Sequence, residues 1–452
     1  MEQAGQQLSV REKFGYGLGD FAANIIFQTV MIFLMYFYTD IFGIPVAAVG
    51  TLFLLSRIWD AINDPLMGSI ADRTRSQHGR FRPWIRWTAV PFGVMAVLMF
   101  STPDLGVTGK IIYAYVTYIL MMTIYTANNI PYGALSAVMT SDSVERTSLN
   151  AYRFVLAMVA GLMIQALTLP LIDLLGGDNK AQGYQLTMAI FATLAVVFFF
   201  ITFYTTKERI EPPKGQATPV KDDLRDLLHN RPWVVLFFMG LVTFIFLSLR
   251  LAVGLYYFQY YVGDESLFTM FAVVGTVGMI LGIPLSKPLT RKFGKKNIYI
   301  TSNLLAGLAI LGLFLPSPEQ YKVAYLLSAL VGFFSGPGVP ILWAMYADVA
   351  DYSEWKFGRR ATGIIFSAAT FGQKFGWGIG GALTGWLLAL FNYVPNQAQG
   401  PEALLGIKLM LSIIPGTLML LSVVLLFYYN LSESFMKEIQ LELASRREKD
   451  QG

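Results

Sequence analysis

Long apolar runs separated by short polar segments recur along the entire chain. Twelve of these runs have enough residues to cross the roughly 30 Å hydrocarbon core of a bilayer as helices. They cover residues 14–40, 46–69, 84–102, 110–137, 148–173, 185–206, 233–262, 267–290, 298–315, 320–349, 361–390 and 404–430. The pattern predicts an all-α integral membrane protein with twelve transmembrane helices.

One polar segment divides the twelve runs into two groups of six. Residues 206–232 combine Pro-Pro, Gly and charges of both signs, which predicts a linker followed by a short amphipathic helix. We therefore expect two pseudo-symmetric six-helix bundles, over residues 1–205 and 233–430. Residues 431–452 form a tail, which we expect to be a solvated or surface helix without chemistry of its own. The segment after the second run echoes the segment after the eighth, and transporters built from such repeats bind substrate near mid-membrane between the halves.

Glycine and proline gather at two places inside the predicted spans. Residues 332–340 (GFFSGPGVP) contain two prolines, which predicts a bend in the tenth helix. Residues 376–385 (GWGIGGALTG) contain small residues without proline, which favours close packing of the eleventh helix against a neighbour.

The composition excludes several classes of protein. Of the 452 residues, 55% are hydrophobic and only 14% are charged, whereas soluble proteins carry about 25% charged residues. The chain has no cysteine, which excludes disulfides, thiolate metal sites and thiol catalysis. The motif GLGD at residues 17–20 matches intramembrane aspartyl proteases, but those also need a Tyr-Asp pair on a preceding span, and no span precedes this one. We therefore expect neither an enzyme nor a cofactor.

Basic residues are distributed unevenly between the polar segments. Residues 72–84 and 291–297 are dense in Lys and Arg, whereas the connections FGIP and VGDES are nearly free of them. Since short basic loops stay in the cytoplasm, this asymmetry predicts cytoplasmic N- and C-termini in a multi-pass protein of the cell inner membrane. It also accounts for the net charge of +5 without a nucleic-acid partner. The polar first residues predict that no signal peptide is cleaved.

The second run contains the polar motif WDAINDP, in which Asp60, Asn63 and Asp64 share one helix face. A charge at the bilayer centre costs about 2.5–3.5 kcal/mol on insertion scales, so these residues are functional candidates. Two carboxylates one turn apart repel each other unless a cation lies between them, and oxygen ligands suit a small hard cation. We expect Na⁺, Li⁺ or H⁺ here, with the hydroxyl of Thr126 completing the site.

The alternative is a static charge network in which Arg57 and Lys374 neutralise these acids and hold helices together. The two hypotheses are compatible, because a lysine can neutralise the site when the ion is absent. The other charged residues that we expect deep in the membrane are Asp20, Arg153 and Arg250.

The basic segment after the second run forms a candidate gate. Its pattern G-x-x-x-D-R-x-R, followed by G-R-x-R, can build a charge cluster that locks one conformation. The residues with this candidate role are Gly68, Asp72, Arg73 and Arg80, together with Asp348 and Asp351 near the end of the tenth run. The alternative is that the arginines serve membrane topology alone.

Several motifs resemble those of one known family: YGLGD, YTDIFG, RIWDAINDPLMGSIADRTRSQHGRFRPW, YTANNIPYGALS and ADVADYSEWKFGRR. They extend over essentially the whole chain, which resembles the glycoside–pentoside–hexuronide:cation symporters of the major facilitator superfamily. The resemblance implies a central cavity, alternating access, and coupling of sugar uptake to Na⁺, Li⁺ or H⁺. We expect the carrier to be a monomer in the lipid bilayer.

The resemblance also assigns roles to residues. It implies that the cation site consists of Asp60, Asn63, Asp64 and Thr126, and that Arg153 and Lys374 lie in the sugar cavity. The full set of candidate sugar-binding residues is Asp20, Asn24, Tyr125, Asn129, Arg153, Arg250, Trp343 and Lys374. Aromatic rings among them could stack on a sugar, although a single aromatic residue more often serves packing.

Departures from the family pattern bear on the substrate. Asn24 and Asn129 stand where relatives have aspartates that bind sugar hydroxyls, and Gly133 stands where they have a tryptophan. The cavity is then less negative, so one hypothesis is a substrate with a carboxylate, as in a hexuronide, bound by an arginine fork. A neutral glycoside or pentoside is the alternative. Further alternatives are cation-coupled transport of a lysolipid-like amphiphile and a sensor that does not transport.

Overall fold

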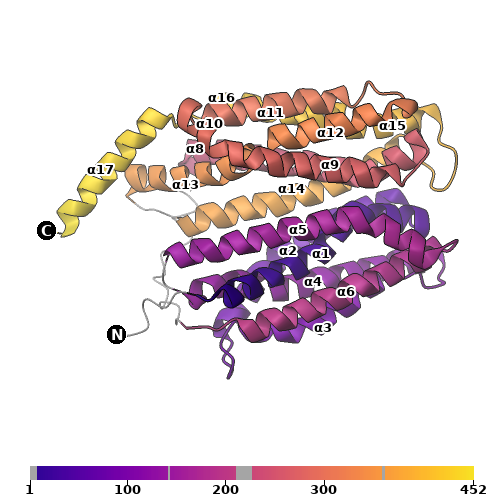
Figure 1. Ribbon diagram of the computed structural model, residues 1–452, viewed down its shortest axis with the longest axis horizontal. Helices are drawn as coiled ribbons and strands as arrows, with labels where there is room; N and C mark the ends of the chain where they lie inside the picture. The colour runs from indigo at the N-terminus through magenta and orange to yellow at the C-terminus, as the bar shows by residue number, and fades with distance from the viewer. Residues whose placement is uncertain (1–7, 141–142, 210–226, 359–361, 452) are drawn as a thin grey trace. The chain divides into compact units, whose positions relative to one another are not determined.

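The computed structural model describes residues 8–140, 143–209, 227–358 and 362–451 (Figure 1). Every regular element within these ranges is a helix. The chain divides into two compact units. The first consists of Met1–Gly215 with Val394–Gln397, and the second of Gln216–Tyr393 with Ala398–Gly452. Most of the predicted linker, residues 210–226, lies outside the described residues.

The first unit is a bundle of long helices, drawn from indigo to magenta in Figure 1. Its elements are α1 (Val10–Tyr36), the π-helical turn η1 (Phe37–Ile41), α2 (Val46–Arg73), α3 (Arg82–Met99), α4 (Val107–Met139), α5 (Ser143–Gly176) and α6 (Lys180–Thr205). Helix α1 packs against α5 and α6, while α4 packs against both α2 and α3. The polar motif of α2 therefore faces a bundle in which α4 is its main neighbour.

The second unit contains more and shorter helices. They are α8 (Arg231–Tyr256), η2 (Tyr257–Val262), α9 (Leu267–Gly282), η3 (Ile283–Leu285), α10 (Ser286–Phe293), α11 (Lys295–Gly312), η4 (Pro318–Gln320), α12 (Tyr321–Ser335), α13 (Gly338–Phe357), α14 (Thr362–Leu390), α15 (Pro401–Leu411), α16 (Ile413–Phe427) and α17 (Glu433–Gln451). Helix α8 packs against α14 and α16, and α9 packs against α12.

The predicted spans coincide with helices throughout the described residues. Each of the twelve apolar runs falls on one helix or on consecutive helices, such as α9 to α10 and α12 to α13. Nine helical segments in the described part of the chain are long and apolar enough to cross a membrane. The prediction of an all-helical membrane protein is confirmed, whereas the count of twelve is consistent with the structure but not established by it.

Local sequence signals explain where several helices begin. Ser9 and Glu12 form a capping box at the start of α1, because the Ser9 hydroxyl accepts the N–H of Glu12 and the Glu12 carboxylate accepts the N–H of Ser9. Asn179 and Asn230 cap α6 and α8 in a similar manner, each accepting the N–H three residues later. Polar residues in the loops thus satisfy the first free amides of helices whose interiors are apolar.

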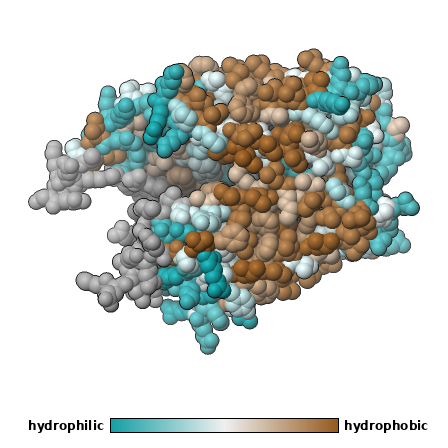
Figure 2. Space-filling model, in the orientation of Figure 1, coloured by the Kyte–Doolittle hydropathy of each residue, from teal (hydrophilic) through white to brown (hydrophobic). Residues whose placement is uncertain are grey.

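Hydrophobic side chains also cover the outside of the helices. On the face drawn in Figure 2, hydrophobic residues occupy the middle of the helices, and hydrophilic residues gather towards their ends. Large apolar side chains are strongly exposed, among them Ile112, Leu174 and Leu326. Such a surface is stable in hydrocarbon but not in water.

Glycine sets the closest helix contacts of the second unit. A Cβ added to Gly332 of α12 would lie 1.9 Å from the carbonyl oxygen of Gly275 on α9, and one added to Gly278 would lie 2.3 Å from that of Ala329. On α14, a Cβ at Gly380 would lie 2.5 Å from the carbonyl oxygen of Ile245 on α8. The prediction of close packing over residues 376–385 is confirmed.

The predicted bend in the tenth span is also confirmed. Helix α12 ends at Ser335, and α13 begins at Gly338 after a turn at Gly336 and Pro337. Proline at this position removes a backbone donor and clashes with the preceding turn, which interrupts the helix.

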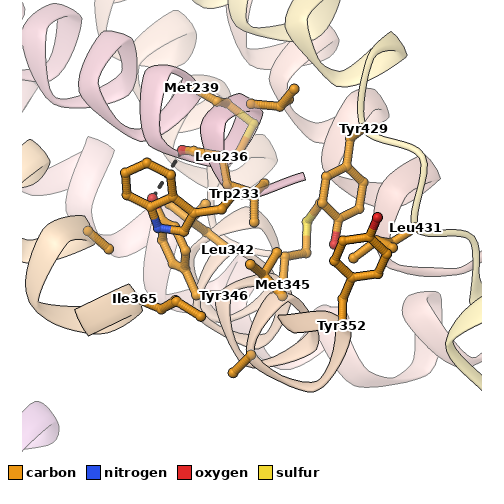
Figure 3. Close-up of a cluster of buried hydrophobic side chains, with 14 of the residues drawn as sticks. Trp233, Leu236, Met239, Leu342, Met345, Tyr346, Tyr352, Ile365, Tyr429 and Leu431 are labelled. Carbon is orange, nitrogen blue, oxygen red and sulfur yellow. Dashed lines mark hydrogen bonds between the residues drawn. The ribbon is translucent and has the colours of Figure 1, made fainter. Parts of the chain in front are cut away.

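The C-terminal helix α17 belongs to the core of the second unit. Its Met436, Ile439 and Leu443 are buried in a cluster with side chains of α8, α13 and α14, part of which is drawn in Figure 3. Within this cluster the Tyr346 hydroxyl donates to the carbonyl oxygen of Leu236 at 3.1 Å. The prediction of a surface helix is consistent with the exposure of most of its described residues, while the apolar residue at every third or fourth position packs inwards.

Polar contacts hold the other end of α17 to α13. The Trp355 indole N–H donates to a carboxylate oxygen of Glu442 at 2.7 Å, and Arg446 pairs with the other oxygen at 2.5 Å. The hydrogen bond from Trp355, followed by the contact with Arg446, lowers the pKa of Glu442 below its usual value. Helix α17 therefore lies along α13 as a fixed part of the second unit.

Replacing Gly332 by Val tests the α9–α12 contact. The added atoms meet a backbone carbonyl, so we expect a loss of at least about 1–3 kcal/mol in the free energy of unfolding, measured as a lower thermal unfolding midpoint in detergent. Gly161→Ala on α5 is the matched control, since its added Cβ would lie 3.8 Å from the nearest side-chain atom. An unchanged midpoint for Gly332→Val would contradict this account of the packing.

Candidate functional site

The polar motif of α2 lies in the membrane-spanning part of the first unit. Asp60 is 5% exposed and Arg57 is 6% exposed, and their side chains form an ion pair of 2.9 Å between Oδ2 and Nη1. The two residues are three positions apart on one helix, a spacing at which side chains meet. The pair places a charge and its counter-charge together in a region that cannot solvate either alone.

Arg57 is also bound by its neighbours on α4. Its Nη2 lies 3.3 Å from the Tyr118 hydroxyl and 3.5 Å from the Met122 sulfur, and its Nε donates to Ser56 at 3.3 Å. These contacts direct the guanidinium away from bulk solvent and towards α4. The part of the static-network hypothesis that pairs Asp60 with Arg57 is present in the structure.

Asp64 has a different environment one turn further along α2. It is partly exposed, and its Oδ1 accepts the Thr126 hydroxyl of α4 at 2.9 Å. Asn63 directly precedes Asp64 in the chain. Its side-chain nitrogen is buried and has no hydrogen-bond partner. Asp64 and Thr126 are thus joined across two helices, and the side-chain N–H group of Asn63 can still donate to an acceptor.

The donor atoms at this position fit a small monovalent cation. Carboxylate, hydroxyl and amide oxygens are hard ligands of the kind that alkali and alkaline-earth ions prefer. No group of three or more His, Cys, Asp or Glu side chains gathers anywhere in the described ranges, which does not favour a multivalent metal centre there. The structure joins Asp64 to Thr126 and pairs Asp60 with Arg57, and Asn63 adjoins Asp64 in the chain. That these four residues together hold a cation stays a prediction.

A second buried ion pair joins α1 to α5. Arg153 Nε lies 3.1 Å from Asp20 Oδ2, and the guanidinium carbon lies 5.4 Å from the centre of the Tyr132 ring. Tyr132 stacks on Tyr16 with ring centroids 4.7 Å apart, and each hydroxyl points to the other residue's carbonyl oxygen. Asp20 and Arg153 are thus held between three helices of the first unit.

Tyr125 of α4 packs against aromatic rings of the first unit. It lies between Phe27 and Phe92, with ring centroids at 5.8 and 6.3 Å. Its hydroxyl lies within electrostatic range of four charged side chains, namely those of Asp20, Arg153, Arg57 and Asp60. Tyr125 therefore lies near the charged groups of both ion pairs of the first unit.

The predicted asparagines differ in their use. Asn24 donates to the backbone carbonyl of Asp20 at 2.8 Å, so part of its amide is engaged within its own helix. Asn129 is partly exposed on α4, one turn beyond Tyr125. A sugar-binding role for either amide stays a prediction.

The remaining sugar-site candidates belong to the second unit. The Arg250 Nη2 donates to the Ser328 hydroxyl at 3.0 Å, and the guanidinium carbon lies 5.5 Å from the Phe271 ring centre. Trp343 is 37% exposed and stacks on Phe366, and Lys374 is partly exposed on α14. Among the described residues, no carboxylate lies within ion-pair distance of Arg250.

The candidate gate of the first unit is organised by an acid that sequence analysis missed. Glu208, just after α6, accepts the backbone N–H groups of Arg80, Phe81 and Arg82 at 2.8 to 2.9 Å. Gly79 has a φ of +102°, and a Cβ there would lie 2.4 Å from the Glu208 carboxyl carbon. The glycine thus permits both the turn and the close approach of the acid.

The other gating candidates have mixed surroundings. Asp72 and Arg73 are exposed at the end of α2, and Gly68 is open enough to take a side chain, its nearest neighbour being Ile130 at 3.9 Å. In the second unit, Asp348 forms an ion pair with Lys295 at the start of α11. Asp351, one turn further along α13, is partly exposed. Neither Glu208 nor Lys295 carries a local sequence signal, since both partners are distant in the chain.

Comparison with known proteins decides the family. Residues 15–433 match the family described as MFS/sugar transport protein. The chain belongs to this family. Its all-helical fold and its buried ion pairs are therefore those of a membrane transporter of the major facilitator superfamily, and the chain is not an enzyme.

Members of the family resemble the chain over nearly its full length. The inner membrane symporter YicJ of Escherichia coli is 40% identical, covering 98% of this chain and 97% of that protein. The isoprimeverose transporter of Lactiplantibacillus pentosus is 36% identical, covering 93% and 89%. The glucuronide carrier protein homolog of E. coli is 32% identical, covering 99% and 98%.

A solved structure shows the same fold at low identity. The nucleoside transporter NupG, determined as a point mutant, matches with a TM-score of 0.67 and 13% identity, covering 92% of this chain and 98% of that one. At this identity the likeness concerns the fold alone, which is the major facilitator fold.

Replacing Asp60 by Asn tests the ion pair in α2. The change leaves the buried Arg57 without a carboxylate, so we expect a loss of about 3–5 kcal/mol in the free energy of unfolding. Asp64→Asn is the matched control, and it should cost less than about 1 kcal/mol because Asp64 is partly exposed and an amide oxygen can still accept from Thr126. Unfolding in detergent measures both, and equal losses would argue against a structural pair.

Proposed function

We propose that the chain is a cation-coupled sugar symporter that works by alternating access. The observation that carries this proposal is a pair of polar sites in the first unit. Asp64 accepts the Thr126 hydroxyl next to the Arg57–Asp60 ion pair of α2, and a further ion pair, Asp20–Arg153, joins α1 to α5. Coupled transport requires that occupation of one site changes the affinity of the other. Two charged polar sites within one helix bundle are suited to such coupling.

The descriptions of the relatives support a sugar as the transported substrate. Two are described as an isoprimeverose transporter and a glucuronide carrier homolog, and a third as an inner membrane symporter. Similarity to them extends over nearly the whole chain, so it includes the helices that line the site. A sugar or glycoside is therefore the cargo class that we propose for this chain.

The cation acts at Asp60, Asn63, Asp64 and Thr126. A cation between the two carboxylates competes with Arg57 for Asp60 and removes the repulsion between the acids. The candidates are Na⁺, Li⁺ and H⁺, because a carboxylate can also take up a proton directly. No further cofactor is part of the proposal.

Coupling follows from linkage between the two sites. Release of Arg57 by the cation changes the charge balance of the first unit, which also contains the Asp20–Arg153 ion pair. If the cation raises sugar affinity, sugar must raise cation affinity by the same factor, and such couplings amount to about 1–3 kcal/mol. With the termini in the cytoplasm, each 100 mV of membrane potential adds about 2.3 kcal/mol per translocated charge. The unit of transport that we propose is the monomer.

The surroundings of Arg250 bear on whether the substrate is charged or neutral. Asp20 already neutralises Arg153, whereas Arg250 has only the Ser328 hydroxyl and the Phe271 ring as partners in the described part of the chain. A guanidinium without a carboxylate is suited to receive one from a ligand. We therefore favour an anionic sugar such as a hexuronide over a neutral glycoside or pentoside.

Uptake into proteoliposomes tests the coupling. With an inward Na⁺, Li⁺ or H⁺ gradient, wild-type protein should accumulate a substrate from a panel of glycosides and glucuronides. Asp64→Asn and Asp60→Asn should abolish concentrative uptake and retain part of the substrate exchange, since exchange needs binding and reorientation without net cation flow.

The matched control is Asp178→Asn, an acid-to-amide change in the exposed turn before α6, which should leave accumulation unaltered. Normal accumulation by both motif variants would refute the cation site. Equal loss of accumulation and exchange would indicate instead that the acids are needed for folding or for substrate binding.

A second experiment tests Arg250 with matched substrates. Arg250→Gln should raise the glucuronide concentration needed for half-maximal uptake about 10- to 100-fold, the effect of losing one charged hydrogen-bonding partner. The corresponding neutral glucoside should change less than about threefold, and Arg250→Lys should retain part of the preference because its charge remains. If glucuronide does not compete with the neutral sugar in wild-type protein, the anionic substrate is rejected.

A further inference from the structure

The second unit contains a cavity of about 670 Å³ that is lined by none of the residues assigned to transport. It lies where the end of α10, the start of α11 and the start of α17 meet, and Figure 1 shows these three helices at the same end of the unit. Its walls consist of residues 290–294, 296–297 and 431–434 together with Lys437. None of these residues takes part in the proposed cation or sugar sites.

Positive charge dominates the cavity. Its lining includes four cationic side chains and one carboxylate, a surplus of three positive charges. The cations are Arg291, Lys292, Lys296 and Lys437, and the acid is Glu433. The Glu433 carboxylate is already engaged, because it accepts the backbone N–H of Lys295 at 2.8 Å. The cations thus share a concave surface with little internal neutralisation.

Further donors are oriented towards an anion. Helices α11 and α17 both begin at the cavity, and the amino ends of long helices favour negative charge. The Thr290 hydroxyl in the wall is buried and has no hydrogen-bond partner. Cations, helix starts and a free hydroxyl together form a receptor for a phosphate group.

The position of the cavity favours a lipid as the source of that phosphate. The segment Leu267–Phe293 is a candidate membrane span, and only 22% of its apolar window is buried, less than in any other candidate span of the described chain. The cavity includes the last four residues of this span. Exposed apolar side chains lead along it to the cavity, namely Leu281, Leu285 and Phe293. Headgroup phosphates lie at this depth, and acyl chains would lie along α9.

We propose that this cavity binds the phosphate headgroup of an anionic phospholipid, with its acyl chains against the exposed face of α9. Basic pockets between helices at the cytoplasmic surface bind headgroups of anionic lipids, and each cation near the surface adds about 1 kcal/mol. The lipid would join α10, α11 and α17 through one ligand. It thereby stabilises the contact between the C-terminal helix and the bundle.

Native mass spectrometry of the full-length protein in detergent tests the proposal. The probes are phosphatidylglycerol and phosphatidylcholine with identical acyl chains, and inorganic phosphate in excess as a competitor. Wild-type protein should bind phosphatidylglycerol more tightly. The double variant Arg291→Gln/Lys437→Gln should bind it roughly 10- to 30-fold more weakly, with phosphatidylcholine binding unchanged.

Lys287→Gln is the matched control, because Lys287 is an exposed cation of α10 outside the cavity. An equal loss for Lys287→Gln and the double variant, or no preference for phosphatidylglycerol in wild-type protein, overturns the proposal. Complete displacement of phosphatidylglycerol by inorganic phosphate also overturns it, in favour of a site for the free ion. Thermal unfolding without lipid must give the same midpoint for all variants, and transport activity does not enter the measurement.

Discussion

A charged side chain in a membrane-spanning helix must find its counter-charge inside the protein, and this constraint organises the first unit. Arg57 and Asp60 satisfy it within one helix, and Asp20 and Arg153 satisfy it between α1 and α5. Since water is absent from the hydrocarbon core, each pair is far more stable than its separated charges. The Asp20–Arg153 pair also biases the arrangement of α1 and α5, because any motion that separates the partners is costly unless another ion takes a partner's place.

The sequence predicted the helices because the bilayer imposes a simple length and polarity rule. The runs behind α1 and α8 follow this rule closely, and the prolines at residues 337 and 340 marked the break between α12 and α13. The acids of α2 were identifiable because i, i+3 and i+4 spacing is visible in the sequence alone. The partners of Glu208 and Lys295 were not identifiable, since they come from distant segments. The packing of α17 was missed because a mostly charged helix dilutes the apolar positions that form its inner face.

The two units treat buried charge differently. In the described part of the first unit, the arginines Arg57 and Arg153 have carboxylate partners, whereas Arg250 of the second unit relies on a hydroxyl and an aromatic ring. The residues 72–84 and 291–297 resemble each other in sequence, yet they are held in different ways. The Glu208 carboxylate accepts backbone N–H groups of the first segment. In the second segment, Lys295 donates its backbone N–H to Glu433 and forms an ion pair with Asp348. The two segments are therefore similar in sequence, but their charged partners differ between the two units.

Glu208 has a consequence for the order in which the first unit assembles during synthesis. Most helix caps are supplied by the residue directly before the helix, so they form as soon as the helix does. The amides at the start of α3 are instead satisfied by a carboxylate 126 to 128 residues later in the chain. Until α6 has left the ribosome, the loop between α2 and α3 lacks its anchor. This loop thus reaches its final structure only after α6 and Glu208 have been made.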